Sequence, residues 1–183
     1  MSLVMGFDPG INKTGYGILH VETDSWTDFG VLESGNTGYR AVKEIIQRIN
    51  MFAPPQEVVL AMVESQEYHG SDKFKPKNII KLATVSGAIA GLFDNYDIPY
   101  EFVAPSEWKH SVPKNIHHKQ LLDAWGWKYK VANTKQKHVI PLDYPYQHRL
   151  VFSKEQWRDI LDGMGIAKFA AKKLKFDNYT SSL

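Results

Sequence analysis

The sequence contains no cysteine among its 183 residues. This absence excludes a disulfide scaffold, a cysteine nucleophile and any thiolate metal or iron–sulfur site, and it agrees with a reducing compartment. Long hydrophobic runs are absent too, because no stretch approaches the roughly 18 uninterrupted apolar residues of a membrane span. The first residues carry no basic stretch ahead of an apolar one, so we expect no signal peptide and a cytoplasmic protein.

The formal net charge is only +2, yet the charges are divided unevenly along the chain. Residues 1–107 hold 8 Lys/Arg against 14 Asp/Glu, a net of −6, whereas residues 108–149 hold 8 against 2, a net of +6. Five of the seven histidines also fall in the second segment. A basic segment in an otherwise acidic chain favours a polyanionic partner such as nucleic acid. A solvated lysine-rich loop is the alternative interpretation.

The length and the hydrophobic fraction of 43% are typical of one soluble domain, which we expect to span residues 1–183. Hydrophobic periodicity predicts three strands, a helix, a strand, a helix, a strand and two further helices. These elements fall at residues 3–7, 14–21, 26–33, 39–52, 58–63, 77–93, 100–103, 116–125 and 153–175. Residues 126–150 show no clear period, so a basic loop or hairpin is expected there.

This order of elements predicts an α/β fold with a mixed five-stranded sheet and helices on both faces. The first three strands would be antiparallel, and the later strands would run parallel to the first. The arrangement resembles the RNase H-like sheet.

Four acidic residues stand where such a sheet would bring them together. Asp8 directly follows the first apolar run, and Glu64 ends the run 58–63. If the two strands are parallel neighbours, both carboxylates lie at the carboxyl edge of the sheet, where open α/β sheets bind ligands. Asp159 and Asp162 are three residues apart on the last helix and therefore share one of its faces.

Carboxylates that converge without a nearby arginine favour hard divalent cations, Mg²⁺ or Mn²⁺. Two such ions in one site can activate a water molecule and stabilise the leaving oxygen in phosphodiester cleavage. Each acid alone also has a purely structural interpretation: Asp8 as a turn residue before Pro9–Gly10, Glu64 in a salt bridge, and Asp159 as an exposed helix residue. The joint arrangement is what favours a functional site.

Three motifs resemble those of RuvC-type Holliday junction resolvases. The stretch 5–18 reads Met-Gly-Phe-Asp-Pro-Gly, four residues, then Gly-Tyr-Gly-Ile; residues 63–66 read Val-Glu-Ser-Gln; and residues 159–167 read Asp-Ile-Leu-Asp-Gly-Met-Gly-Ile-Ala. The resemblance implies a homodimeric, RNase H-like endonuclease that binds four-way DNA junctions and nicks two opposed strands with two Mg²⁺ or Mn²⁺ ions per site. The metal ligands it implies, which are also the catalytic acids, are Asp8, Glu64, Asp159 and Asp162. Variant members occur in phages and large viruses as well as in bacteria.

The resemblance also implies a basic residue against the scissile phosphate, for which Lys119 is the preferred candidate. The residues expected to contact DNA are Tyr68, Lys109, Lys114, Lys119, Lys128, Lys130, Lys135, Lys137 and Arg149. Phosphate contacts by the lysines and stacking by Trp127, Tyr129, Tyr144 and Tyr146 are the functional interpretation. A solvated face and packing of these aromatics onto the core are the alternatives.

Two further expectations concern single positions. Gly163 stands where the resolvase motif has alanine, a difference that we expect to have no steric consequence. His117 and His118 are expected to be surface residues and not metal ligands or a general base.

Two other functions remain open from the sequence: an RNase H-like nuclease with broader branched-DNA or RNA specificity, and a catalytically silent junction-binding module. A panel of DNA and RNA substrates would distinguish the first from a resolvase.

Overall fold

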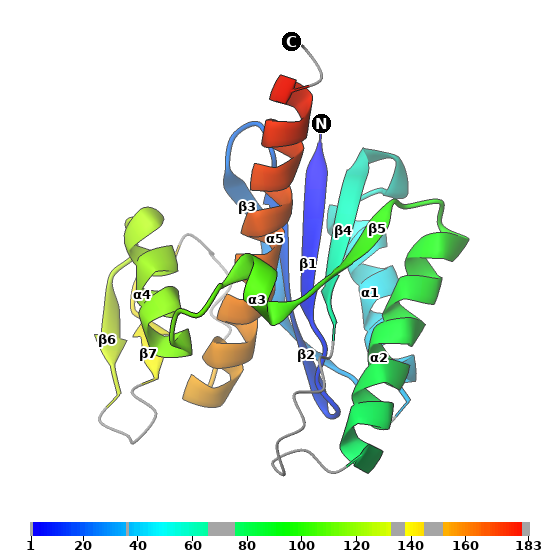
Figure 1. The fold of residues 1–183 in the computed structure, drawn as a ribbon, viewed down its shortest axis with the longest axis horizontal. Coiled ribbons are helices and arrows are strands. Elements are labelled where there is room, and N and C mark those ends of the chain that lie inside the picture. The colour runs from blue at the N-terminus through cyan, green and yellow to red at the C-terminus, as the bar shows by residue number, and fades with distance from the viewer. Residues whose placement is uncertain (1, 36, 66–75, 133–137, 145–151, 181–183) are drawn as a thin grey trace.

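A computed structural model describes residues 2–35, 37–65, 76–132, 138–144 and 152–180. Its main sheet has five strands in the order β3-β2-β1-β4-β5 (Figure 1). The strands are β1 (Leu3–Asp8), β2 (Lys13–His20), β3 (Ser25–Glu33), β4 (Val58–Glu64) and β5 (Tyr100–Val103). The first three pair antiparallel, and β4 and β5 run parallel to β1, which confirms the predicted mixed sheet.

Helices cover both faces of the sheet, as predicted. They are α1 (Tyr39–Phe52), α2 (Pro76–Asn95), α3 (Pro105–Trp108), α4 (Lys114–Ala124) and α5 (Lys154–Thr180), with a short 3₁₀ helix, η1 (Pro55–Glu57), before β4. Because side chains alternate along a strand, Met5 and Phe7 of β1 pack with α1 and α2, whereas Val4 packs with α5 on the other face. Figure 1 shows α5 lying across the sheet opposite α1 and α2.

The final helix begins with the capping box that the sequence predicts. The Ser153 hydroxyl accepts a hydrogen bond from the backbone N–H of Gln156, whose side-chain oxygen accepts one from the backbone N–H of Ser153. Among the described residues, no helix is both long enough and apolar enough to cross a membrane.

α5 lies unusually close to β1 and β2 because glycines face each other across the contact. A Cβ atom at Gly163 would stand 2.5 Å from the backbone nitrogen of Tyr16, and one at Gly15 would overlap the carbonyl oxygen of Asp159. The expectation that alanine would fit equally well at residue 163 is therefore wrong: the backbone of β2 occupies the space of a methyl group.

Residues 126–150 were expected to form a loop or a hairpin, and the segment after α4 forms a hairpin. Strands β6 (Tyr129–Val131) and β7 (Val139–Pro141) pair antiparallel as a separate two-stranded sheet, at the far left of Figure 1. Aromatic residues pack this hairpin onto α5 and β3: Trp127 and Tyr144 have their ring centroids 5.8 and 6.1 Å from that of Phe29. These rings therefore serve packing, whereas Tyr146 lies outside the described residues.

Candidate active site

Asp8 and Glu64 end neighbouring parallel strands at the same edge of the sheet. The register pairs Phe7 of β1 with Val63 of β4, so the two acids follow one step further along. Both strands are central and largely buried, and Asp8 is the one partly exposed residue of β1. The structure therefore places these two carboxylates side by side, as the sequence predicted.

Asp159 and Asp162 complete the group from α5, which packs on β1 and β2. Loss of water around Asp8 raises its pKa well above the ordinary value, and the negative charges of Asp162, Glu64 and Asp159 raise it further. All three other acids are thus close enough to act on Asp8 electrostatically. The structure gathers four carboxylates whose mutual repulsion would be relieved by bound cations.

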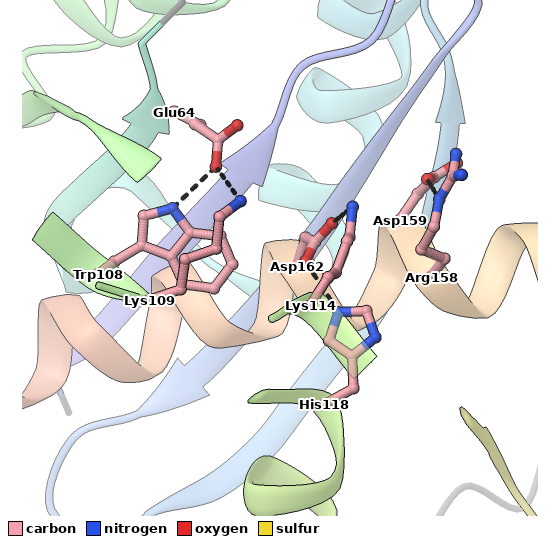
Figure 2. Close-up of polar contacts among 8 residues, drawn as sticks. All are labelled: Glu64, Trp108, Lys109, Lys114, His118, Arg158, Asp159 and Asp162. Atoms are coloured by element: carbon pink, nitrogen blue, oxygen red, sulfur yellow. Dashed lines mark hydrogen bonds and ion pairs between the residues drawn. The ribbon is translucent and has the colours of Figure 1, made fainter. Parts of the chain in front are cut away.

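Asp162 is 1% exposed and has a basic partner on each oxygen. Lys114 and His118, four residues apart on one face of α4, contact its Oδ2 and Oδ1 respectively; the His118 Nε2–Oδ1 distance is 2.8 Å (Figure 2). Burial alone would raise the pKa of Asp162, but the Lys114 ammonium and the His118 hydrogen bond outweigh burial and hold this pKa far below its usual range. Asp162 is therefore ionised.

Glu64 is held by the end of α3. The indole Nε1 of Trp108 donates a hydrogen bond of 2.8 Å to Oε2, and the Lys109 ammonium lies 3.6 Å from the same oxygen. Burial raises the pKa of Glu64, with Lys109 opposing the shift. Figure 2 shows Trp108 and Lys109 converging on one carboxylate, and Lys114 and His118 on the other.

Asp159 pairs with its chain neighbour. The Nε of Arg158 lies 3.1 Å from Asp159 Oδ1, and both side chains are partly exposed. The premise that the acids have no arginine nearby is therefore wrong. At a half-exposed position the pair is worth little energetically, but it places a guanidinium at the rim of the acidic group.

An open pocket of ≈ 480 Å³ adjoins Asp8 and Asp159. Its lining includes three basic residues, Lys13, Lys114 and Arg158, alongside these two acids. Carboxylates at the base with cations around them would suit a phosphate group bound next to metal ions.

As placed, the described residues contain no group of three or more His, Asp or Glu side chains that could hold a metal ion. The contacts above give the reason, since Lys114, Trp108 and Arg158 each occupy an oxygen of a different acid. The donor chemistry nevertheless fits a divalent cation: the acids supply only oxygen, and Asp162 is ionised.

The other residues predicted to contact DNA lie at several places in the fold. Lys119 is half-buried on α4, and within the described parts of the chain no ion pair joins it to the four acids. Lys128 and Lys130 are exposed at the β6 hairpin. Four predicted DNA-contacting residues fall outside the described residues: Tyr68, Lys135, Lys137 and Arg149.

Sequence reasoning missed three residues that contact the acids: Trp108, His118 and Arg158. His118 is 3% exposed, so the expectation of a surface residue is wrong. Arg158 was detectable as the direct neighbour of Asp159. Trp108 and His118 gave no comparable signal, because each lies 44 residues along the chain from the acid it contacts.

Known proteins resemble this chain in sequence and in fold. No model of a protein family matches it. A crossover junction endodeoxyribonuclease RuvC of Chlorobium chlorochromatii (strain CaD3) is 32% identical over 169 residues, which cover 90% of this chain and 77% of that protein. The homologous enzyme of Chlorobium phaeobacteroides is 30% identical over 113 residues, covering 60% of this chain and 59% of that protein.

Two solved structures share the fold. Thermus thermophilus RuvC in complex with a Holliday junction substrate superposes with a TM-score of 0.60 at 17% identity, over 90% of each chain. The yeast mitochondrial Holliday junction resolvase Ydc2 superposes with a TM-score of 0.53 at 16% identity, over 99% of this chain and 84% of that one. The extent and identity of the first sequence match establish that the chain belongs to the RuvC family of crossover junction endodeoxyribonucleases.

Proposed function

We propose that this protein is a metal-dependent endonuclease that resolves four-way DNA junctions. The observation that carries the proposal is the convergence of Asp8, Glu64, Asp159 and Asp162 at one edge of the sheet. Membership of a family of crossover junction endodeoxyribonucleases supplies the substrate class. The pocket beside the acids, with its basic rim, supports a phosphodiester as the reacting group.

The four acids would hold Mg²⁺ or Mn²⁺, two ions in each site. When bound, such ions supply water activation and stabilisation of the leaving oxygen. Lys13, Lys114 and Arg158 line the pocket and would attract and orient the phosphate. To admit an ion at Asp162 Oδ2, Lys114 must move off this oxygen, which frees its ammonium for the phosphate.

The remaining basic residues would bind the arms of the junction. Lys109 contacts Glu64, Lys119 lies on α4, and Lys128 and Lys130 extend the positive charge along the hairpin. Phosphate contacts of this kind add affinity without sequence preference.

A homodimer completes the proposal, because paired nicks on opposed strands need two active sites. Ile80 on α2 and Phe102 on the edge strand β5 are 67% and 50% exposed. Exposed apolar side chains of this size support an interface on that side of the molecule. Light scattering at micromolar concentration with junction DNA present tests the dimer, and a monomer there would contradict it.

The activity is tested by strand-resolved cleavage of a synthetic four-way junction and of a linear duplex, with Mg²⁺ and with EDTA. We expect paired nicks near the branch point on the junction alone, and only with metal. Asp8→Asn and Asp162→Asn should abolish cleavage while junction binding survives, because each change removes a ligand and also removes negative charge facing the DNA.

Retained nicking in both variants would refute the four-acid site. Tight junction binding without any cleavage by the wild type would favour a silent binding module. If the protein cut flaps and RNA–DNA hybrids as readily as junctions, the four-acid site would stand and the proposed substrate would be wrong.

A further inference from the structure

Trp108 and His118 each make a buried hydrogen bond to one of the four acids. Each is 2.8 Å long and ends on a carboxylate that is itself buried: Glu64 is 8% exposed and Asp162 1%. The donors are buried as well, at 5% for Trp108 and 3% for His118. Both residues come from one short stretch of chain, α3 and α4, that borders the site (Figure 2).

We propose that Trp108 and His118 are positioning residues that orient Glu64 and Asp162 for divalent-metal binding. The proposal rests on the proposed function, because it requires these two acids to be metal ligands. Outer hydrogen bonds of this kind fix the orientation of metal ligands, and their loss typically weakens metal binding by about 10–100-fold.

Each of the two donors contacts a single oxygen of its acid. Trp108 donates to Oε2 of Glu64. His118 contacts Oδ1 of Asp162, while the Lys114 ammonium pairs with Oδ2, the oxygen at which a bound cation would replace it. An ionised carboxylate only accepts hydrogen bonds, so Nε2 of His118 carries the proton in this contact.

The chemistry of the Trp108 donor suits a metal ligand better than a simple structural pair. An indole N–H orients the carboxylate and brings no charge of its own, whereas the Lys109 ammonium, 3.6 Å from the same oxygen, partly offsets the charge of Glu64. An arginine at this place would compete with the ion.

The indole of Trp108 is itself held by α5 and α4. A Cβ atom at Gly165 would lie 2.6 Å from Trp108 Cζ3, so the missing side chain at residue 165 makes room for the ring. The ring of His117 packs edge-on against Trp108 with centroids 5.1 Å apart. Burial lowers the pKa of His117 to about 4, so this neighbour is neutral at physiological pH and adds no charge beside the indole.

The test measures Mn²⁺ affinity by titration calorimetry on the full chain without DNA. Trp108→Phe removes the N–H and keeps an aromatic ring, and His118→Leu removes the second donor. We expect each variant to bind Mn²⁺ about 10–100-fold more weakly than wild type. Cleavage of a four-way junction should recover when Mn²⁺ is raised by the same factor, with KM for the junction unchanged.

Two matched variants separate positioning from packing. Trp125→Phe removes a buried indole N–H that has no hydrogen-bond partner among the described residues, so Mn²⁺ affinity should stay at the wild-type value. His118→Gln keeps an N–H donor at the position of Nε2 and should restore most of the affinity that His118→Leu loses.

Two outcomes overturn different claims. If Asp162→Asn loses Mn²⁺ binding while Trp108→Phe and His118→Leu stay within twofold of wild type, the positioning role is refuted and the metal site stands. If Asp162→Asn also binds Mn²⁺ normally, the proposed metal site itself fails.

Discussion

Lys114 supplies positive charge to three of the four acids, Asp8, Glu64 and Asp162. Its ammonium pairs with Asp162, and it lies close enough to Asp8 to oppose the rise in the pKa of that carboxyl. The Asp162 side chain is almost fully buried, whereas Lys114 is partly exposed and can exchange its partner for solvent or phosphate. One residue thus stabilises the acidic group when no cation is bound there.

We predict that Lys114→Met lowers the free energy of unfolding of the metal-free protein by about 1–3 kcal/mol. The change leaves the buried carboxylate of Asp162 without its cation, although the exposure of Lys114 reduces the cost. Mn²⁺ should recover more stability in this variant than in wild type, because a bound cation replaces the missing charge. Urea unfolding with EDTA and with Mn²⁺ measures both effects.

The control is Lys119→Met, which alters another lysine of the same helix. Among the described residues no ion pair connects Lys119 to the four acids, so we expect only a small change in the free energy of unfolding in EDTA. Identical responses of the two variants to Mn²⁺ would contradict the role assigned to Lys114.

A buried carboxylate outside the pocket joins three elements of the fold. Asp28 of β3 accepts a 2.6 Å hydrogen bond from the Tyr16 hydroxyl of β2, and Arg48 of α1 lies 3.4 Å from the same oxygen. Burial raises the pKa of Asp28 above its ordinary value, and the two partners only partly offset this shift. Ionisation of Asp28 is therefore less favourable in the folded protein than in the unfolded chain.

This raised pKa predicts the sign of a pH effect on stability. The folded state binds the Asp28 proton more tightly than the unfolded state, so the contribution is full below about pH 4 and is lost as pH rises through the folded pKa. Asp28→Asn should remove this pH-dependent loss of stability, because asparagine does not titrate. Between pH 4.5 and pH 7.5, the unfolding free energy of wild type should therefore fall relative to that of Asp28→Asn, and the absence of this relative fall would contradict the prediction.

The contact between α5 and β2 decides where two of the acids lie. Because Gly163 faces the backbone of Tyr16, we predict that Gly163→Ala moves α5 away from the sheet and costs about 1–3 kcal/mol of stability. Cleavage should fall as well, since Asp159 and Asp162 move with the helix.

A second glycine provides the comparison. A Cβ atom at Gly91 of α2 would meet no atom within 4 Å, so Gly91→Ala should raise stability by about 0.5–1 kcal/mol through helix propensity alone. Chemical denaturation of both variants measures the contrast. If Gly163→Ala and Gly91→Ala changed the free energy of unfolding in the same direction, close helix–sheet contact would not be the reason for glycine at residue 163.

Charge is divided unevenly along the whole chain, with a net of +6 in residues 108–149 against −6 in residues 1–107. We predict that the double change Lys128→Gln and Lys130→Gln weakens junction binding and lowers the slope of log affinity against log salt by about 2, roughly one phosphate for each lysine. Electrophoretic mobility shifts over a series of salt concentrations measure the slope.

Lys168→Gln is the matched control, because this lysine pairs with Asp24 on the main sheet. Its salt slope should equal that of wild type. An unchanged slope in the double variant would mean that the hairpin does not touch the DNA backbone.

The sequence by itself determined the strands of the main sheet and its longer helices, and it singled out the four acids. The strands and helices followed from hydrophobic periodicity, which acts over neighbouring residues, and the side-by-side placement of Asp8 and Glu64 followed because parallel central strands end at one edge. The final helix was readable from the local capping box at Ser153.

Only the tertiary structure decided what surrounds those acids. Trp108 reaches Glu64, and His118 reaches Asp162, across 44 residues of chain in each case. The cost of alanine at Gly163 likewise depends on how closely a helix approaches a strand from another part of the sequence. Such contacts have no local signal, because they arise from the packing of elements whose order is readable but whose separation and rotation are set by the whole core.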